Sequence, residues 1–543
     1  MKRNFLFLIL TLIVINLSAA SASAGQGISY YKAGFPIVAK PLLLQEYNTD
    51  VATRSETSFY LGNIYFGENK MDSAAIYFKK GLADNQDDVL NVIGLAMLKV
   101  KTNPKEADLE IQNVLKIKNN KKNQDYLIAA AHAYLFNGNI DQAAVYEDKA
   151  KSIKTKYANL AVLSGDIELA RKDIGKACSN YELAILYDDN CKEAYIKYAR
   201  AYASVNTQLA IDMLNKLKLK DPSFLLVDKE LADIYYDKND FENAAKLYEN
   251  YLKSGNSNVQ DLTKYAMTLY LNKDYVKSLE ISKLGLEKDP RNPAFNRLAL
   301  YNNVALNNYN EALVYGDSFF NKSHKPDISF FDHTNYGLAL RQSKRYDLAI
   351  QEYNKALKID STQLGVGLRK EMSDMYRDRR DFPHAISNYQ IYLKSLSEDK
   401  RNADDLVNLG KLYYSYGSAD STTAKKNLLL KADSIFAKVA VMDPTNYRGN
   451  YYRANINFVL DPDNGTAKPF YEQTLTLVEA KADPRYNQII IECCRFLGYY
   501  YYLKEDYTQS KIYWNKILAI EPTNEVAVKA IDGIDATLKR KKK

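Results

Sequence analysis

One spacing of small and aromatic residues recurs along most of this chain, from Phe59 to Pro522. A small residue is followed three positions later by an aromatic or large apolar residue, then by a second small residue, and then by another aromatic residue. Two clear instances are Gly62, Tyr65, Ala74 and Phe78, and Gly498, Tyr501, Ser510 and Trp514. The apolar residues keep a helical period throughout, so the pattern predicts pairs of helices and no strand.

The small residues mark units about 34 residues long. The anchors of successive units are Gly62, Gly94, Ala131, Gly165, Ala199, Ala232, Ala266, Ala299, Gly337, Ser373, Gly410, Ala454 and Gly498. A pair of short helices cannot bury its apolar stripe alone, so such pairs must stack on their neighbours. We therefore expect the 543 residues to form one continuous array rather than several globular domains. The longer steps predict insertions at 416 to 430, at 460 to 466 and at the connection 476 to 487.

This recurrence resembles the tetratricopeptide repeat (TPR) family. The resemblance implies an all-α fold, a right-handed solenoid of helix-turn-helix repeats in which glycine or alanine lies where the two helices cross closely. We expect a shortened first repeat or cap over 25–50, and about 12 to 13 repeats, some degenerate, over 51–522. A capping helix and a basic tail are expected over 523–543.

Residues 1–24 have the composition of a secretory signal peptide. Lys2 and Arg3 give a basic start, residues 5–17 are mostly apolar, and 22–24 supply the small residues of a cleavage site. An uncleaved anchor is the alternative, although the apolar stretch is short for a spanning helix. The richness in lysine, asparagine and tyrosine suggests an AT-rich bacterial genome. The expected location is the periplasm or the periplasmic face of the outer membrane, with a eukaryotic secretory protein left open.

No catalytic motif is present, so the chain is predicted not to be an enzyme and to hold no cofactor or metal. Its histidines are far apart, and neither a zinc-binding His-Glu-x-x-His, a Gly-x-Ser-x-Gly elbow nor a phosphate-binding glycine loop occurs. Bonds between the cysteines are disfavoured by their spacing, so free thiols are expected. These cysteines are Cys178, Cys191, Cys493 and Cys494.

The net charge argues against a nucleic-acid partner. The formal charge is +8, and it becomes +6 once Lys2 and Arg3 are removed. Residues 539–543 are all basic and carry five of those charges. The array is thus near neutral, whereas a nucleic-acid binder shows a basic stripe on its folded surface. The basic tail is either a solvated segment or a contact with an acidic membrane surface or partner.

The 45 tyrosines direct attention to binding. In the TPR family one aromatic position packs inside the repeat, and the resemblance places Tyr65, Tyr202, Tyr235, Tyr376, Tyr413 and Tyr501 there. The next residue along the helix turns toward the concave groove. The candidate partner-binding residues at that position are Phe66, Tyr236, Tyr270, Tyr414, Phe458 and Tyr502. Aromatic residues supply large, rigid contact area, but the same residues could instead pack between repeats.

The expected function is a protein–protein interaction scaffold of the bacterial cell envelope that binds a peptide or protein segment in the groove. No repeat has the lysine and asparagine pair by which TPR cochaperones hold an acidic C-terminus. For example, Lys229 is followed one turn later by Asp233. The alternative function is a carbohydrate- or solute-binding helical protein of an outer-membrane uptake system, which a pocket closed by the insertions would favour.

Overall fold

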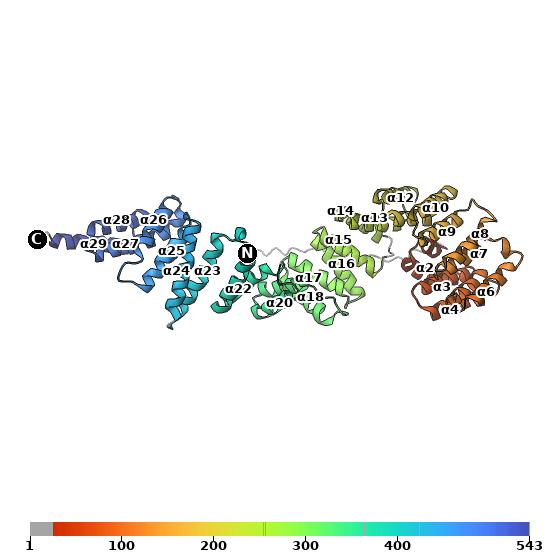
Figure 1. Cartoon of the computed structure of the whole chain (residues 1–543), viewed down its shortest axis with the longest axis horizontal. Coiled ribbons are helices and arrows are strands. Elements are labelled where there is room, and N and C mark those ends of the chain that lie inside the picture. Colours follow the sequence, from red (N-terminus) through yellow and green to blue (C-terminus); the bar gives the residue numbers. More distant parts are fainter. Residues whose placement is uncertain (1–24, 254, 256, 363, 423, 542–543) are drawn as a thin grey trace, which may run out of the picture. The chain divides into compact units, whose positions relative to one another are not determined.

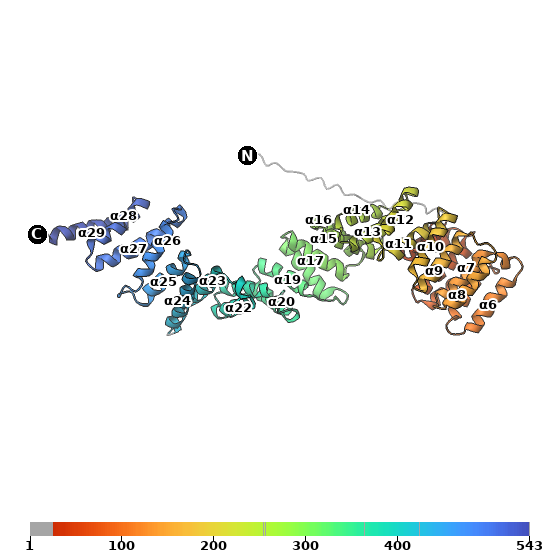
Figure 2. The same ribbon diagram turned by 45° about the horizontal axis from the view of Figure 1, so that its top comes forward.

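The computed structural model describes residues 25–541 except 254, 256, 363 and 423. The signal peptide predicted over 1–24 lies outside the described residues. Every regular element of the described part is a helix, which confirms the predicted all-α solenoid. The chain forms two compact units, and the division falls at Leu306, in the repeat anchored by Ala299. Figures 1 and 2 show the helices of each unit stacked in pairs.

The first unit runs to Leu306 and also includes Asp317–Lys325. Its helices are α1 (Gln26–Lys32), α2 (Pro36–Thr49), α3 (Arg54–Gly67), α4 (Met71–Asp84), α5 (Val89–Lys99), α6 (Pro104–Lys116), η1 (Asn120–Lys122), α7 (Gln124–Leu135), α8 (Ile140–Lys151), α9 (Ala158–Ala170), α10 (Ile174–Tyr187), α11 (Lys192–Tyr202), α12 (Thr207–Lys220), α13 (Leu226–Asp237), α14 (Phe241–Leu252), α15 (Val259–Leu271), α16 (Tyr275–Lys288), α17 (Pro293–Ala305) and η2 (Ser318–Lys322).

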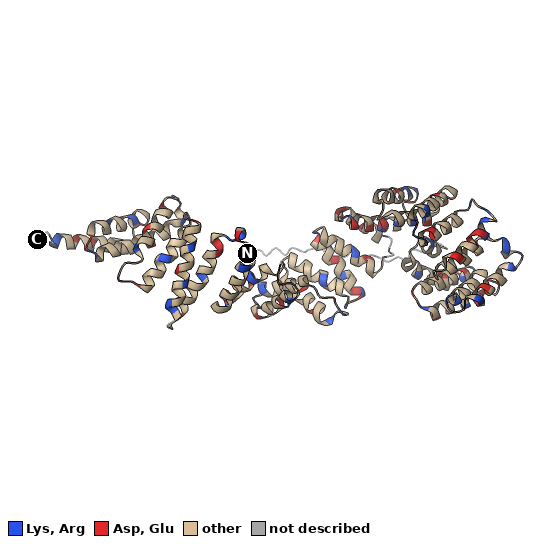
Figure 3. Cartoon of the chain, in the orientation of Figure 1, with Lys and Arg blue, Asp and Glu red and all other residues tan. Residues whose placement is uncertain are grey.

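The second unit comprises Asn307–Gly316 and the chain from Pro326 onward. Its helices are α18 (Tyr309–Asp317), α19 (Phe330–Gln342), α20 (Tyr346–Ile359), α21 (Val366–Asp378), α22 (Phe382–Ser395), η3 (Glu398–Lys400), α23 (Ala403–Ala419), α24 (Ala424–Met442), α25 (Tyr447–Leu460), α26 (Lys468–Glu479), η4 (Pro484–Tyr486), α27 (Asn487–Leu503), α28 (Tyr507–Ile520) and α29 (Glu525–Lys541). Acidic and basic residues are interspersed along both units (Figure 3).

Close helix crossing explains the anchor glycines. A Cβ atom on Gly62 would lie 2.3 Å from the Phe78 ring, and one on Gly165 would lie 2.3 Å from the Tyr181 ring. Phe78 and Tyr181 are themselves fully buried. The aromatic residue of the second helix therefore fills the space above the glycine of the first helix, and any larger side chain there would push the helices apart.

The turn between the helices of a pair repeats the same local chemistry. Lys172 and Asn239 have φ angles of 66° and 60°, in the left-handed region. Each is followed by an aspartate, Asp173 or Asp240, whose carboxylate accepts a hydrogen bond from a backbone N–H in the first turn of the next helix. One residue thus reverses the chain and the next satisfies an N–H group that has no partner within the helix.

The insertion predicted at 416 to 430 is mostly helical. α23 and α24 are 17 and 19 residues long, and only a short connection separates Ala419 from Ala424. The extra residues therefore lengthen the two helices rather than form a loop. The insertion at 460 to 466 is a turn, in which Asn464 donates to Asp461 and Gly465 has a φ angle of 76°.

Both ends of the array are closed by helices. α1 has seven residues and packs on α2. α29 packs on α28 and buries Ala527 and Ile534. Val528 of the same helix is 40% exposed.

Candidate partner-binding surfaces

The six candidate aromatic residues lie near the C-terminal ends of the first helices of their repeats. Those of the first unit are Phe66 on α3, Tyr236 on α13 and Tyr270 on α15, and those of the second unit are Tyr414 on α23, Phe458 on α25 and Tyr502 on α27. They are therefore spread over two separate units.

Three of these rings, those of Tyr236, Tyr270 and Tyr502, contact the ring five residues later in the sequence. The centroid of Tyr236 lies 5.7 Å from that of Phe241, and the centroid of Tyr502 lies 5.6 Å from that of Tyr507. Phe241 and Tyr507 are each the first residue of a second helix. The contact thus bridges the turn within one repeat, a role that the sequence analysis did not assign to these positions.

Tyr270 packs against two other rings. Its ring lies 5.6 Å from Tyr275 and 5.9 Å from Tyr301 of the next repeat, and burial raises the pKa of its hydroxyl. Tyr414 likewise meets Tyr452 of the next repeat at 5.6 Å. Four candidates are half-buried and pack against the hydrophobic core, namely Phe66, Tyr236, Tyr270 and Tyr414.

Phe458 and Tyr502 are the two exposed candidates, with exposed fractions of 44% and 38%. Phe458, near the C-terminal end of α25, reaches the middle of α27, because its ring lies 5.6 Å from that of Phe496. Three more exposed apolar residues lie near the C-terminal ends of these two helices. They are Val459, Tyr499 and Leu503.

We call these five exposed residues the α25–α27 patch. Tyr499, Tyr502 and Leu503 are spaced by three and four residues, so they share one face of α27. The exposed fraction of Tyr499, 56%, exceeds that of any of the six candidates. The sequence analysis missed it, although the helical spacing of three from Tyr502 was visible.

The first unit places a charged network where adjacent first helices face each other. The Asp166 carboxylate accepts hydrogen bonds from the Tyr181 hydroxyl at 2.8 Å and the Lys197 ammonium at 2.5 Å, and it lies 3.4 Å from His132 Nε2. Burial opposes the charge on Asp166, but Lys197 and His132 outweigh it, so the pKa of Asp166 falls to about 2. This carboxylate is therefore ionised and already fully paired.

The same arrangement returns two repeats later. The Asp233 carboxylate accepts from the Tyr248 hydroxyl at 2.5 Å, from Lys264 at 2.7 Å and from Lys229 at 2.9 Å. In both networks the tyrosine is 15 residues and the lysine of the next repeat 31 residues after the aspartate. These networks join neighbouring repeats. Lys229 is paired with Asp233 within its own helix.

The N-terminal hairpin α1–α2 covers part of the first unit. Arg200 of α11 donates to the carbonyl oxygen of Gly34 at 3.0 Å and forms two hydrogen bonds with the carboxylate of Glu230. Its guanidinium also lies 4.8 Å from the centre of the Phe35 ring. The hairpin therefore contacts repeats that follow it by more than 160 residues.

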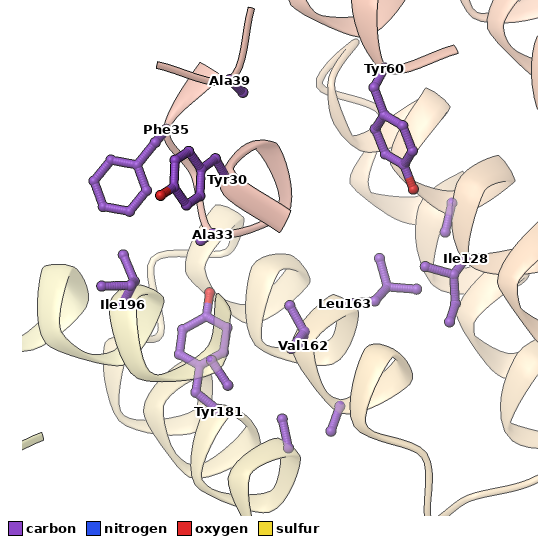
Figure 4. Packing of buried hydrophobic residues seen from close by; sticks show 14 of the residues in the cluster. Tyr30, Ala33, Phe35, Ala39, Tyr60, Ile128, Val162, Leu163, Tyr181 and Ile196 are labelled. Carbon is purple, nitrogen blue, oxygen red and sulfur yellow. The ribbon is translucent and has the colours of Figure 1, made fainter. Parts of the chain in front are cut away.

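Aromatic contacts complete this docking. Tyr30 and Phe35 lie 5.7 Å and 6.4 Å from the ring of Phe224, and Tyr31 lies 5.3 Å from Tyr60 of α3. Figure 4 shows Tyr30, Ala33 and Phe35 beside the helices that carry Tyr181 and Ile196. In the first unit, residues of α3 and α11 are thus covered by the protein's own N-terminal segment. The sequence analysis did not predict this contact.

The described residues offer no arrangement typical of an active site. Among them, no group of histidine, cysteine, aspartate or glutamate residues could hold a metal ion. Burial raises the pKa of Cys178 to about 11 and that of Cys494 to about 12, so these thiols are protonated at neutral pH. All four cysteines are free, as expected from their spacing. No helix in this part of the chain is long and apolar enough to cross a membrane.

A family model described as tetratricopeptide repeat matches residues 333–363, which contain most of α19 and all of α20. No curated protein matches the chain. Among solved structures, the C-terminal part of a TPR repeat-containing protein from Cytophaga hutchinsonii is 25% identical, over 50% of this chain and 99% of that one, with a TM-score of 0.40.

Two further structures are more distant. A tetratricopeptide repeat protein from Parabacteroides merdae is 14% identical over 44% of this chain and 93% of its own, with a TM-score of 0.31. Yeast Tom70 is 14% identical over 86% of this chain and 99% of its own, with a TM-score of 0.25. These TM-scores are too low to carry an argument. The matched repeat and the return of its helix pairing and glycine–aromatic contacts elsewhere in the array identify this chain as a tetratricopeptide repeat protein.

Proposed function

We propose that this protein is a non-enzymatic scaffold of the bacterial cell envelope that binds a peptide or protein segment through its second unit. TPR arrays generally serve as protein-interaction scaffolds rather than catalysts, and their stacked repeats provide extended surfaces for partners. The location in the envelope rests on the composition of residues 1–24.

The observation that carries the proposal is the α25–α27 patch. Clustered exposed apolar side chains on a folded protein mark interaction sites, and tyrosine contributes a large rigid ring with a polar end. The patch lies on the first helices of two consecutive repeats, which in this family form the concave groove. In the first unit the α1–α2 hairpin already covers part of the face of α3 and α11, which favours the second unit as the partner's site.

Site-specific photocrosslinking in the intact envelope tests the proposal. A benzoylphenylalanine residue at position 499 should yield a discrete adduct with a protein, which mass spectrometry identifies. The matched control is the same residue at position 441, because Val441 of α24 is 82% exposed but lies on a second helix. Equal adducts at both positions, or none at 499, would refute the patch. Recovery of the chain in the cytosol with Met1 intact would refute the location.

A carbohydrate- or solute-binding function is the second candidate, and one pocket favours it. A cavity of about 290 Å³ is lined by Asp443, Tyr447, Arg448, Lys481 and Tyr486, beside the predicted insertion at 476 to 487. Phenol rings can stack on a sugar while the charged groups bond its hydroxyls. Binding of a soluble glycan that Tyr447→Ala abolishes, with the α25–α27 patch unaffected, would decide for this candidate.

A further inference from the structure

Two short segments at connections between repeats of the first unit are rich in lysine. Residues 116–123, after α6, and residues 149–156, at the end of α8, carry eight lysines between them and no aspartate or glutamate. The lysines are Lys116, Lys118, Lys121, Lys122, Lys149, Lys151, Lys154 and Lys156. In an array that is otherwise near neutral, this is a strong local excess of positive charge.

The two connections lie side by side. The Gln124 side-chain amide donates to the carbonyl oxygens of Ala150 and Lys154, at 2.9 and 2.6 Å. Between them is a cavity of about 450 Å³ with an apolar floor that includes Leu115 and Leu127. Lys116, Lys121 and Lys149 line this cavity. Basic residues colour the loops beside α6, α7 and α8 blue in Figure 3.

The lysines are available for a ligand. All eight are exposed. Within the described residues, ion pairs of this group with a carboxylate involve Lys151 alone, which pairs with Glu147 and Asp148. Lys149 additionally lies 4.3 Å from the centre of the Tyr146 ring, which holds its side chain at the cavity.

Two isoleucines project among these lysines. Ile117 is 57% exposed and Ile153 is 40% exposed, one on each connection. An aliphatic side chain surrounded by lysines is poorly placed in water, but it suits the boundary between lipid headgroups and acyl chains, with the lysines at the level of the anionic headgroups.

A nucleic acid fits this surface less well. The two connections contain no arginine, the residue suited to bidentate recognition of phosphate. The rings beside them are also poorly placed for stacking on a base, because Tyr146 is buried and the Lys154 ammonium lies 5.9 Å from the centre of the Tyr157 ring. We therefore propose that the surface formed by residues 116–123 and 149–156 docks onto an anionic phospholipid bilayer, with a headgroup phosphate in the lysine-lined cavity.

Vesicle sedimentation with the purified protein tests this docking. Residues 539–543 are first replaced by glutamine, so that the basic tail cannot supply the binding. The protein should bind vesicles of phosphatidylcholine with phosphatidylglycerol, and not vesicles of phosphatidylcholine alone. The triple variant Lys116→Gln, Lys121→Gln and Lys149→Gln should bind on the order of 100-fold more weakly, since each lysine near an anionic surface adds about a tenfold effect or somewhat less.

The matched control is Lys358→Gln, Lys394→Gln and Lys438→Gln, which removes the same charge from exposed lysines of the second unit. It should leave vesicle binding within about twofold of the parent, in line with the screening of distant surface charges. Loss of binding equal to that of the cavity variant would mean that net charge alone is responsible, and would overturn the proposal.

The variant Ile117→Asn with Ile153→Asn separates a bilayer from other polyanions. It should weaken vesicle binding and leave unchanged any residual binding to a single-stranded oligonucleotide or to polyglutamate. If this variant binds vesicles as well as the parent does, the isoleucines do not enter a bilayer and the proposal is overturned. If either soluble polyanion displaces the protein from vesicles and is itself bound more tightly, the surface is a site for that polyanion and not for a bilayer. Circular dichroism melts of each variant confirm that the fold is kept.

Discussion

Arg200 donates a hydrogen bond from Nη1 to the carbonyl oxygen of Gly34, 166 residues earlier in the chain, over 3.0 Å. In most solenoids each repeat contacts only its neighbours, so stability is lost stepwise from the ends. Here the N-terminal hairpin is tied to a repeat in the middle of the first unit. The first unit should therefore unfold with more cooperativity than a purely nearest-neighbour array.

Replacing Arg200 by alanine should release the hairpin. The change removes the bond to Gly34 and leaves the buried carboxylate of Glu230 without its partner. We expect a loss of about 2 kcal/mol in the unfolding free energy of the first unit, the range for hydrogen bonds that involve charged groups. Hydrogen exchange of residues 26–49 should accelerate well before the core of α9 and α10 exchanges.

Arg171→Ala is the matched control. Arg171 also pairs with a glutamate, Glu168, but the pair is local to the C-terminal end of α9 and partly exposed, where it contributes about 0.5 kcal/mol or less. Protection of residues 26–49 should not change in this variant. Equal effects of the two substitutions would show that the hairpin is not held by Arg200.

Asp166 should make the stability of the first unit depend on pH. Because Lys197 and His132 lower its pKa to about 2 in the folded state, its ionised form stabilises the fold above the ordinary pKa of an aspartate, near 4. That contribution, about 2 kcal/mol at neutral pH, is lost as the pH falls from about 4 toward 2. Urea unfolding should therefore show Asp166→Asn to be destabilised at pH 7, with the difference from the parent narrowing below pH 4.

Asp347→Asn supplies the comparison. Asp347 is 73% exposed and pairs with Arg379 at the surface, so its replacement should cost under about 0.5 kcal/mol at any pH. A difference between Asp166→Asn and the parent that stays constant down to pH 3 would contradict the assignment of the low pKa to the paired carboxylate.

The contacts within one repeat could be predicted, because the spacing of small and aromatic residues along the sequence determines them. The glycine–aromatic crossing at Gly62 and Phe78 follows directly from the repeat, and so do the helix pairs. The docking of Phe35 and Gly34 on Arg200 could not be predicted. It depends on the way in which the repeats stack, because the stacking decides which residues that are distant in sequence meet in space. The repeat spacing predicts extra residues at 416 to 430 but not their conformation, because spacing alone does not distinguish extra helical turns in α23 and α24 from a loop.

The candidate site was predictable only in part. Sequence position placed Tyr270 and Tyr502 in one class, but their surroundings differ. Tyr270 packs between Tyr275 and Tyr301, whereas Tyr502 meets Tyr507 and remains 38% exposed. The exposed fraction of each ring depends on the side chains around it, and the repeat spacing does not specify those side chains.

Lys172 and Asn239 allow a test of the turn chemistry. Both are exposed and both adopt the left-handed conformation, which is costly for lysine and less so for asparagine. Lys172→Gly should raise the unfolding free energy by about 0.5 to 1 kcal/mol, because the relief of backbone strain exceeds the added entropy of the unfolded chain. Asn239→Gly should change it by less than about 0.5 kcal/mol. Chemical denaturation of the two variants measures the difference, and a destabilised Lys172→Gly would contradict it.

The last prediction separates packing from binding among the candidate aromatic residues. Phe458→Ala with Tyr502→Ala should weaken binding of the crosslinked partner at least tenfold, the size expected for an interface anchor of more than about 1.4 kcal/mol. The melting temperature should shift little, because both side chains are substantially exposed.

Tyr270→Ala should behave in the opposite way, with a loss of about 2 kcal/mol or more in stability, since its ring packs against two others. Its effect on partner binding should be small, because Tyr270 belongs to the first unit. If Phe458 and Tyr502 prove as costly to the fold as Tyr270, these rings serve the core, and the partner must bind elsewhere on the array.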